Sequence, residues 1–240
     1  PMIKFFRKIR QKLLSENKFS KYLIYAIGEI VLVVIGILIA LQINNWNEDN
    51  KEKSAKLIYS KRLLDDISSN SVEYNHYIKL LSNRQKKISS YRQLIKNGGL
   101  SLEQLNDSLS NYGNVKIAYN PASATYNDLI STGNIVLFSN DEKDAIFNYY
   151  RLLEYFEETI DANEAERNNE RTESLRYLNN DTLNLYESIN FKRDQSQIIQ
   201  GLKHRLNEMD KETEIFTFLR NNEELYFDFA KYADSTLTKK

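Results

Sequence analysis

The chain has 240 residues, with 33 basic and 33 acidic side chains and a formal net charge of zero at pH 7. Residues 44–240 contain 26 basic and 31 acidic side chains, so their net charge is near −5. This charge gives no electrostatic reason to bind nucleic acid. The absence of cysteine means that packing without disulfides must hold the fold, and seven glycines with two prolines favour long helices over a turn-rich β architecture.

Residues 1–21 form a basic segment that we expect on the cytoplasmic side of a membrane. Its apolar residues fall on one helical stripe and are Met2, Phe5, Phe6, Ile9 and Leu13. Its expected interfacial anchors are Lys4, Arg7, Lys8, Arg10 and Lys12. The pattern is typical of an amphipathic helix lying in the headgroup layer. The alternative is a frayed end whose charges only set topology.

Residues 22–43 predict one transmembrane helix. They read YLIYAIGEIVLVVIGILIALQI, and about 20 apolar residues suffice to span a bilayer. The basic flank precedes this run, so the positive-inside rule places residues 44–240 on the far side of the membrane. A cleaved signal peptide is the alternative, but the end of the run offers no A-x-A pattern, which favours an uncleaved signal-anchor. Trp46 fits an interfacial anchor on the outer side.

Glu29 is the candidate functional residue of this span. Alternating steps of four and three place it on one helix face, which also carries Ala26, Val33, Gly36 and Ala40. Gly36 and Ala40 form a small-x-x-x-small pair that lets two helices approach closely. Because lipid disfavours a charged carboxyl, we expect a seam between copies that shelters protonated Glu29. The alternatives are a monomer with neutral Glu29 facing lipid or water, and contact with a different membrane subunit.

Residues 51–96 predict a long coiled-coil-like helix. Heptad steps from Leu57 to Ile95 meet apolar residues at eight of twelve positions. Gly98 and Gly99 supply a stop, and Ser101-x-x-Gln104 is a capping box for a short following helix. The sequence leaves open whether the membrane helix continues through residues 44–50 into this one.

Residues 114–140 break the helical pattern. Two short apolar runs, residues 115–119 and 135–138, flank a predicted helix over 122–131, and they either pair as short strands or serve as extended connectors. Ser139-x-x-Glu142 then opens a second long helix, whose polar stretch over residues 161–174 we expect to be solvated. Later apolar clusters complete the bundle, so residues 44–240 predict one all-α domain.

No residue pattern in the chain indicates catalysis, a cofactor or a metal. His76 and His204 are the two histidines, and neither stands in a metal-ligand spacing. The sixteen tyrosines are expected to pack in the bundle, with a peptide- or glycan-binding aromatic groove as the alternative. The sequence therefore predicts a protein that is not an enzyme.

Two segments carry a family resemblance. They are MIKFFRKIRQKLLSENKFSKYLIYAIGEIVLVVIGILIALQINNWNE at the start and ATYNDLISTGNIVLFSNDEKDAIFNYY further along. They resemble a family of uncharacterised single-pass proteins from Bacteroidetes-type Gram-negative bacteria. The resemblance implies an anchor in the bacterial inner membrane with a periplasmic helical domain. It implies no activity.

Our leading hypothesis is a non-enzymatic, homo-oligomeric scaffold, anchored in the lipid bilayer, whose periplasmic helices engage a second membrane or periplasmic protein. A second hypothesis is a subunit coupled to the proton-motive force through Glu29. A third is a periplasmic sensor holding a ligand near residues 119–138.

Overall fold

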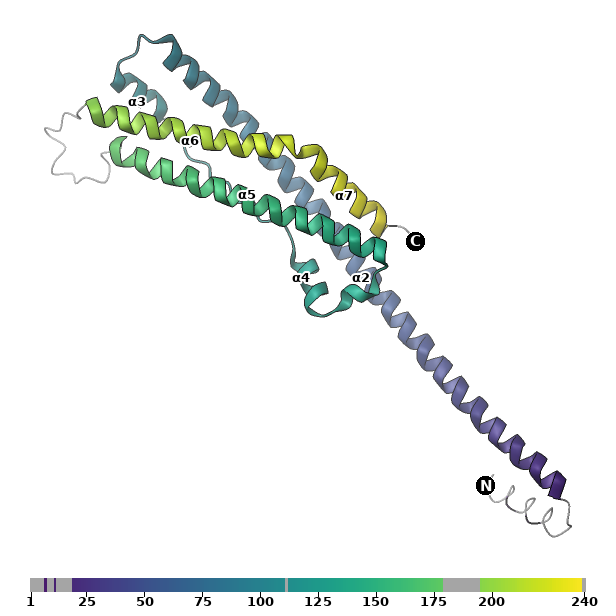
Figure 1. Cartoon of the computed structure of the whole chain (residues 1–240). Coiled ribbons are helices and arrows are strands. Elements are labelled where there is room, and N and C mark those ends of the chain that lie inside the picture. The colour runs from purple at the N-terminus through teal and green to yellow at the C-terminus, as the bar shows by residue number, and fades with distance from the viewer. Residues whose placement is uncertain (1–6, 8–10, 12–18, 111, 179–194, 239–240) are drawn as a thin grey trace. The chain divides into compact units, whose positions relative to one another are not determined.

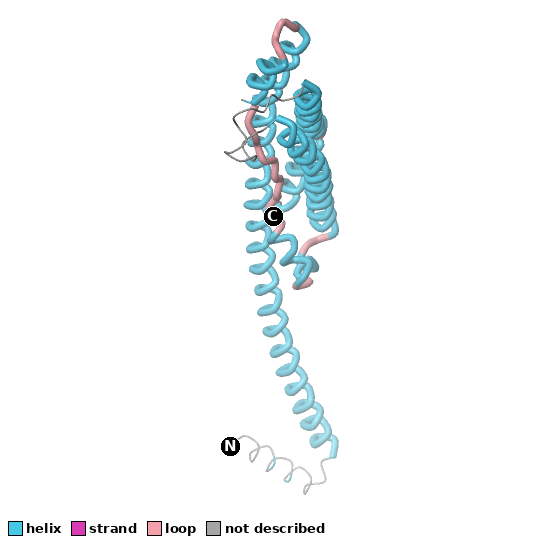
Figure 2. The backbone as a smooth tube through the Cα atoms, turned by 90° about the vertical axis from the view of Figure 1, so that its left-hand side faces the viewer, coloured by secondary structure: helices cyan, strands magenta, loops and turns pink. Residues whose placement is uncertain are grey.

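The computed structural model describes residues 7, 11, 19–110, 112–178 and 195–238. They belong to two compact units, Pro1–Leu57 and Ile58–Lys240, which are described separately. The elements, in chain order, are α2 (Phe19–Asn97), α3 (Leu102–Ser110), α4 (Ala124–Ser131), the 3₁₀-helix η1 (Asn134–Leu137), α5 (Asn140–Leu178), α6 (Gln195–Asn221) and α7 (Glu223–Leu237). Within these described residues every element is helical, as Figure 2 shows, so the predicted all-α class is confirmed.

Helix α2 is unbroken from Phe19 to Asn97, so residues 44–50 continue the helix. Within the described part of the chain, it is the one helix long and apolar enough to cross a membrane. Its large apolar side chains between residues 23 and 43 are all exposed. The helix ends where predicted, because Gly98 and Gly99 take positive φ angles of 67° and 85° that suit glycine.

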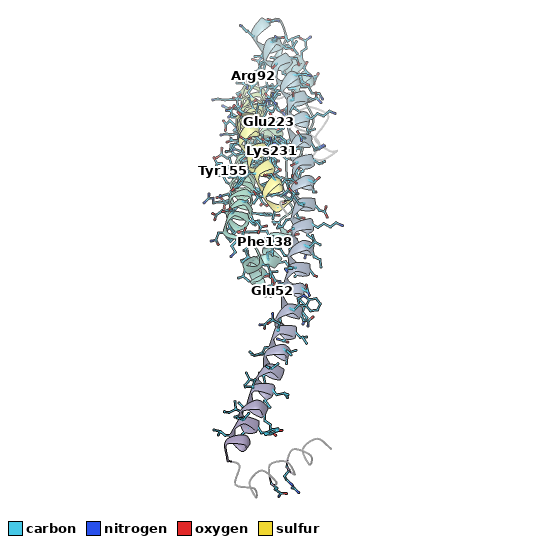
Figure 3. The ribbon with its side chains drawn as sticks, turned by 90° about the vertical axis from the view of Figure 1, so that its right-hand side faces the viewer. Glu52, Arg92, Phe138, Tyr155, Glu223 and Lys231 are labelled. Atoms are coloured by element: carbon cyan, nitrogen blue, oxygen red, sulfur yellow. The ribbon has the colours of Figure 1, made fainter. Side chains whose placement is uncertain are left out.

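The unit from Ile58 onward is a bundle of long helices (Figure 1). Helices α5 and α6 lie side by side, and α7 continues beyond Asn222 along α5. The bundle-forming part of α2 runs antiparallel to α6, since Tyr74 donates a hydrogen bond to the Leu219 carbonyl and Arg84 reaches Glu212. Figure 3 shows side chains between these helices, with Arg92 and Phe138 labelled towards the two ends of the bundle.

Two separate apolar cores hold the bundle together. The first core joins α2 residues such as Leu63 and Tyr74 to α5 and α7, and Tyr74 stacks on Tyr226 with ring centroids 4.1 Å apart. The second core is smaller and consists of Ile88, Leu109, Tyr112, Leu178, Ile198, Leu202 and Met209. The prediction that tyrosines pack in the bundle is confirmed for the six that are buried, whereas Tyr155, Tyr177 and Tyr232 are exposed.

Residues 112–123, here called the strap, have no regular secondary structure. Side chains, and not a neighbouring strand, supply hydrogen-bond partners to the strap backbone. The Tyr77 hydroxyl donates to the Ala118 carbonyl at 2.6 Å, and Asn70 Oδ1 accepts the Ala122 N–H at 2.6 Å. The paired-strand prediction for residues 115–119 is therefore wrong, and the extended connector is correct for this run.

The second apolar run, residues 135–138, lies largely in η1. Both predictions for it, a short strand and an extended connector, are therefore wrong. Gly133 adopts a left-handed conformation with φ of 73°, and its carbonyl accepts the Val136 N–H at 3.3 Å. This turn redirects the chain into a 3₁₀ geometry.

Both predicted capping boxes form. Ser101 N–H donates to Gln104 Oε1 at 2.9 Å, and Ser139 N–H donates to Glu142 Oε2 at 2.7 Å. The reciprocal bonds from Gln104 and Glu142 amides reach the serine hydroxyls at 3.2 and 3.4 Å. Each box satisfies amides that the first helical turn leaves without partners.

Candidate functional site

The predicted seam residues lie on the α2 surface. Val33, Gly36 and Ala40 are exposed, while Ala26 and Glu29 are partly covered. A Cβ added at Gly36 would meet nothing within 4 Å in the described part of the chain. This face therefore has room for a neighbouring helix, as close small-residue packing requires.

The predicted interface anchors divide into two groups. Trp46 is 68% exposed and Arg7 is exposed. Lys4, Lys8, Arg10 and Lys12 lie outside the described residues, as does most of the predicted amphipathic helix.

A buried ionic cluster lies between the two apolar cores. It joins α2, α5 and α6, and its members are Arg84, Glu164, Arg167, Arg205, Glu208 and Glu212. Each is at most 7% exposed. Along α2, Leu81 of the first core precedes Arg84, and Ile88 of the second core follows it. The cluster is thus a polar layer within an otherwise apolar interior.

Arg84 anchors the α2 side of the cluster. Its Nη2 donates to Glu212 Oε2 at 2.9 Å, and its guanidinium stacks over the Tyr112 ring at 4.1 Å. The Tyr112 hydroxyl also donates to Glu212 Oε2, at 2.7 Å. Burial alone would lower the pKa of Arg84, but the hydrogen bond and charge of Glu212 outweigh burial and raise it. Arg84 therefore stays charged.

Arg167 is fully buried and ties α5 to the strap. Its Nε donates to Glu164 Oε2 at 2.7 Å, and its Nη2 donates to the Val115 carbonyl at 2.6 Å. Its Nη1 donates to Glu208 Oε1 at 3.4 Å. Burial raises the pKa of Glu208, whereas the charge of Arg205 lowers it.

Three arginines face three glutamates, so the cluster is balanced in charge. Such layers fix the register of long helices, because any slip leaves a buried charge without its partner. The prediction that residues 161–174 are solvated is correct for the outer face of α5 and wrong for Glu164, Arg167 and Ser174, which are buried. A signal in the sequence could have found Glu164 and Arg167, because the apolar stripe through Tyr149, Phe156 and Ile160 continues in phase through both residues.

A groove of about 390 Å³ lies between the strap, α4 and α5. Pro121 and Tyr126 line one wall, and Phe147, Tyr150, Glu154 and Glu157 lie on α5. The groove overlaps the segment near residues 119–138 where the sequence allowed a ligand. Its size is typical of small-molecule sites.

The histidines take no part in these sites. His204 Nδ1 lies 2.8 Å from Glu170 Oε2, and its ring stacks on Tyr177. Over the described residues, no group of three or more histidine or acidic side chains is arranged to hold a metal ion.

Residues 29–194 match a family described as Family of unknown function (DUF6090). The chain belongs to this family. The resemblance to an uncharacterised family is thereby confirmed. The match begins at Glu29, so it includes most of the apolar span together with α3, α4 and α5. Comparisons with curated proteins and with solved structures found no match.

Proposed function

We propose that this chain is a non-enzymatic, single-pass protein of a bacterial inner membrane that self-associates through α2 and presents its bundle in the periplasm as a scaffold. The proposal rests on one observation. The one described helix apolar enough to span a membrane, α2, exposes all its large apolar side chains between residues 23 and 43 and carries Glu29 and Gly36 on one face. Exposed apolar surface of this extent requires a bilayer, a partner or both.

The Glu29 face supports self-association. A carboxyl within an apolar span is costly and is stabilised when it faces a protein surface instead of lipid. Gly36 and Ala40 allow close approach of a second helix on that same face. Each copy would shelter the carboxyl of the other.

The absence of native cysteine gives a direct test by disulfide cross-linking. We would introduce Gly36→Cys, Ala40→Cys and, as the matched control, Leu38→Cys, which lies about 200° around the helix from Gly36. Oxidation in native membranes should yield cross-linked dimers from the first two variants and none from the third. Equal cross-linking from Leu38→Cys, or none from any variant, would refute self-association through this face.

Glu29→Gln in the Gly36→Cys background separates the scaffold from the proton-coupled alternative. Loss of the cross-link supports a structural carboxyl within the seam. A cross-link that persists favours the alternative, in which Glu29 serves proton coupling.

The orientation of the chain in the membrane is tested with Gln11→Cys and Ser235→Cys. A maleimide that cannot cross the membrane, applied to spheroplasts, should label Ser235→Cys. It should label Gln11→Cys only after permeabilisation.

A further inference from the structure

The groove between α4 and α5 has an aromatic wall of defined geometry. Tyr126 of α4 stacks on Tyr150 of α5 with ring centroids 4.5 Å apart and planes 10° apart. Phe147 meets Tyr126 at 6.3 Å with planes 85° apart. The Tyr150 hydroxyl donates to Asp66 Oδ2 at 3.4 Å, which holds this ring against α2. The wall is thus built from rings that the fold itself positions.

The groove also has an acidic wall. Glu154 and Glu157 line it, one turn apart on α5. Burial, and next the charge of Glu154, raises the pKa of the Tyr126 phenol. Burial raises the pKa of Glu157 most, and the nearby charges of Asp161, Glu154 and Glu158 raise it further.

The charges at the groove are unequal. Arg151 is the basic residue in its lining, and its Nη2 donates to Asn148 Oδ1 at 2.8 Å. Glu154 and Glu157 thus outnumber Arg151 in the lining by two carboxylates to one guanidinium. The field within the groove therefore favours a positive charge.

We propose that this groove binds a small organic cation, an ammonium group carried on an apolar body. Aromatic ring faces attract cations through their quadrupole, and the two carboxylates supply the opposite charge. A volume of about 390 Å³ suits a small molecule rather than a folded partner. The site is independent of the α2 seam, because it uses α4, α5 and the strap.

The test uses the full-length protein in detergent and choline as the probe, with binding measured by calorimetry at low and high salt. Its neutral isostere, 3,3-dimethylbutan-1-ol, has the same shape without the charge. We expect saturable choline binding that weakens with salt, and binding of the neutral isostere weaker by about tenfold or more.

Variants locate the site. Glu154→Gln with Glu157→Gln, and separately Tyr126→Leu, should each weaken choline binding by about tenfold or more. The matched control is Glu103→Gln with Glu224→Gln, which removes the same charge from exposed positions on α3 and α7 and should leave binding unchanged. Circular dichroism checks that each variant keeps its helical content and melting temperature.

Four results would overturn the proposal, and the first three come from the choline experiments. They are no saturable binding of choline, equal binding of the neutral isostere, and equal loss in the groove and control variants. Binding of a lysine-rich peptide without binding of choline would also overturn it, since the occupant would then be a macromolecule.

Discussion

Replacing Arg167 with methionine should be the most damaging single change in the bundle. Methionine keeps much of the side-chain length but removes the guanidinium. The substitution leaves Glu164, Glu208 and Glu212 buried with only Arg84 and Arg205 to compensate them. It also removes the donor to the Val115 carbonyl, which lies 2.6 Å away.

The magnitude follows from these contacts. Breaking a buried ion pair by removing one partner costs about 3–5 kcal/mol, because the remaining charge stays in a low-dielectric interior. For a domain of this size, each kcal/mol lowers the melting temperature by about 2–4 °C. We therefore expect Arg167→Met to lower the melting temperature by about 6–20 °C.

The measurement is urea and thermal unfolding of the full-length protein, followed by near-UV circular dichroism of its packed tyrosines. The control is Arg176→Met on the same helix, whose side chain is 69% exposed and pairs with Glu173 at 2.6 Å. An exposed pair contributes about 0–1 kcal/mol, so this variant should unfold nearly as the native chain does.

A second substitution tests the charge argument itself. Glu164→Gln in the Arg167→Met background restores two arginines against two glutamates and keeps an acceptor near the Ile117 amide. The double variant should be more stable than Arg167→Met alone. A single variant within about 1 kcal/mol of the native protein, or a double variant less stable than the single one, would refute the reasoning.

Two further predictions concern α5 and α6. Gly201→Ala places a Cβ 2.4 Å from Leu178 Cγ and 2.9 Å from Tyr177 Cβ, so it should destabilise the bundle by about 1–3 kcal/mol in urea unfolding, with partial recovery on adding Leu178→Ala. Glu157 has a folded-state pKa raised above its ordinary 4.5, so its charge costs folding free energy above that pH and nothing below it. Glu157→Gln should therefore stabilise the protein at pH 7, because it removes the cost of burying the charge and, in addition, the repulsion from Asp161 one turn on, which is about 0.2–0.5 kcal/mol. That gain should vanish in unfolding experiments below pH 4.5, and a gain that persists there would contradict the electrostatic cause.

Local rules predicted much of the fold. The heptad-like stripe of α2, the stop at Gly98 and both capping boxes depend on residues within a turn or two of one another. The strap was harder to predict, because side chains far away in the sequence form the hydrogen bonds to its backbone. Asn70 lies 52 residues from its partner Ala122, and Tyr77 lies 41 residues from Ala118. No local pattern carries that information.

The ionic cluster was missed for a different reason. A polar run on a helix is usually solvated, and residues 161–174 look like such a run. Burial of Arg167 depends on Glu208 and Glu212, which lie 41 and 45 residues further along the chain. The phase of the α5 stripe, continued past Ile160, would have indicated the buried positions, but only the assembled bundle shows the charges that compensate them.

The cluster and the groove both place charged side chains beside apolar ones, but they differ in how those charges are compensated. Glu208 accepts hydrogen bonds from Arg205 at 2.6 Å and from Arg167 at 3.4 Å, so buried arginines compensate its charge. At Glu157, the named neighbours are acids that add to the effect of burial. A sequence that specifies its fold consistently tends to break its own rules at functional sites. The groove, where two acids share one arginine, is therefore the stronger sign of a ligand, and the balanced cluster is the stronger sign of structure.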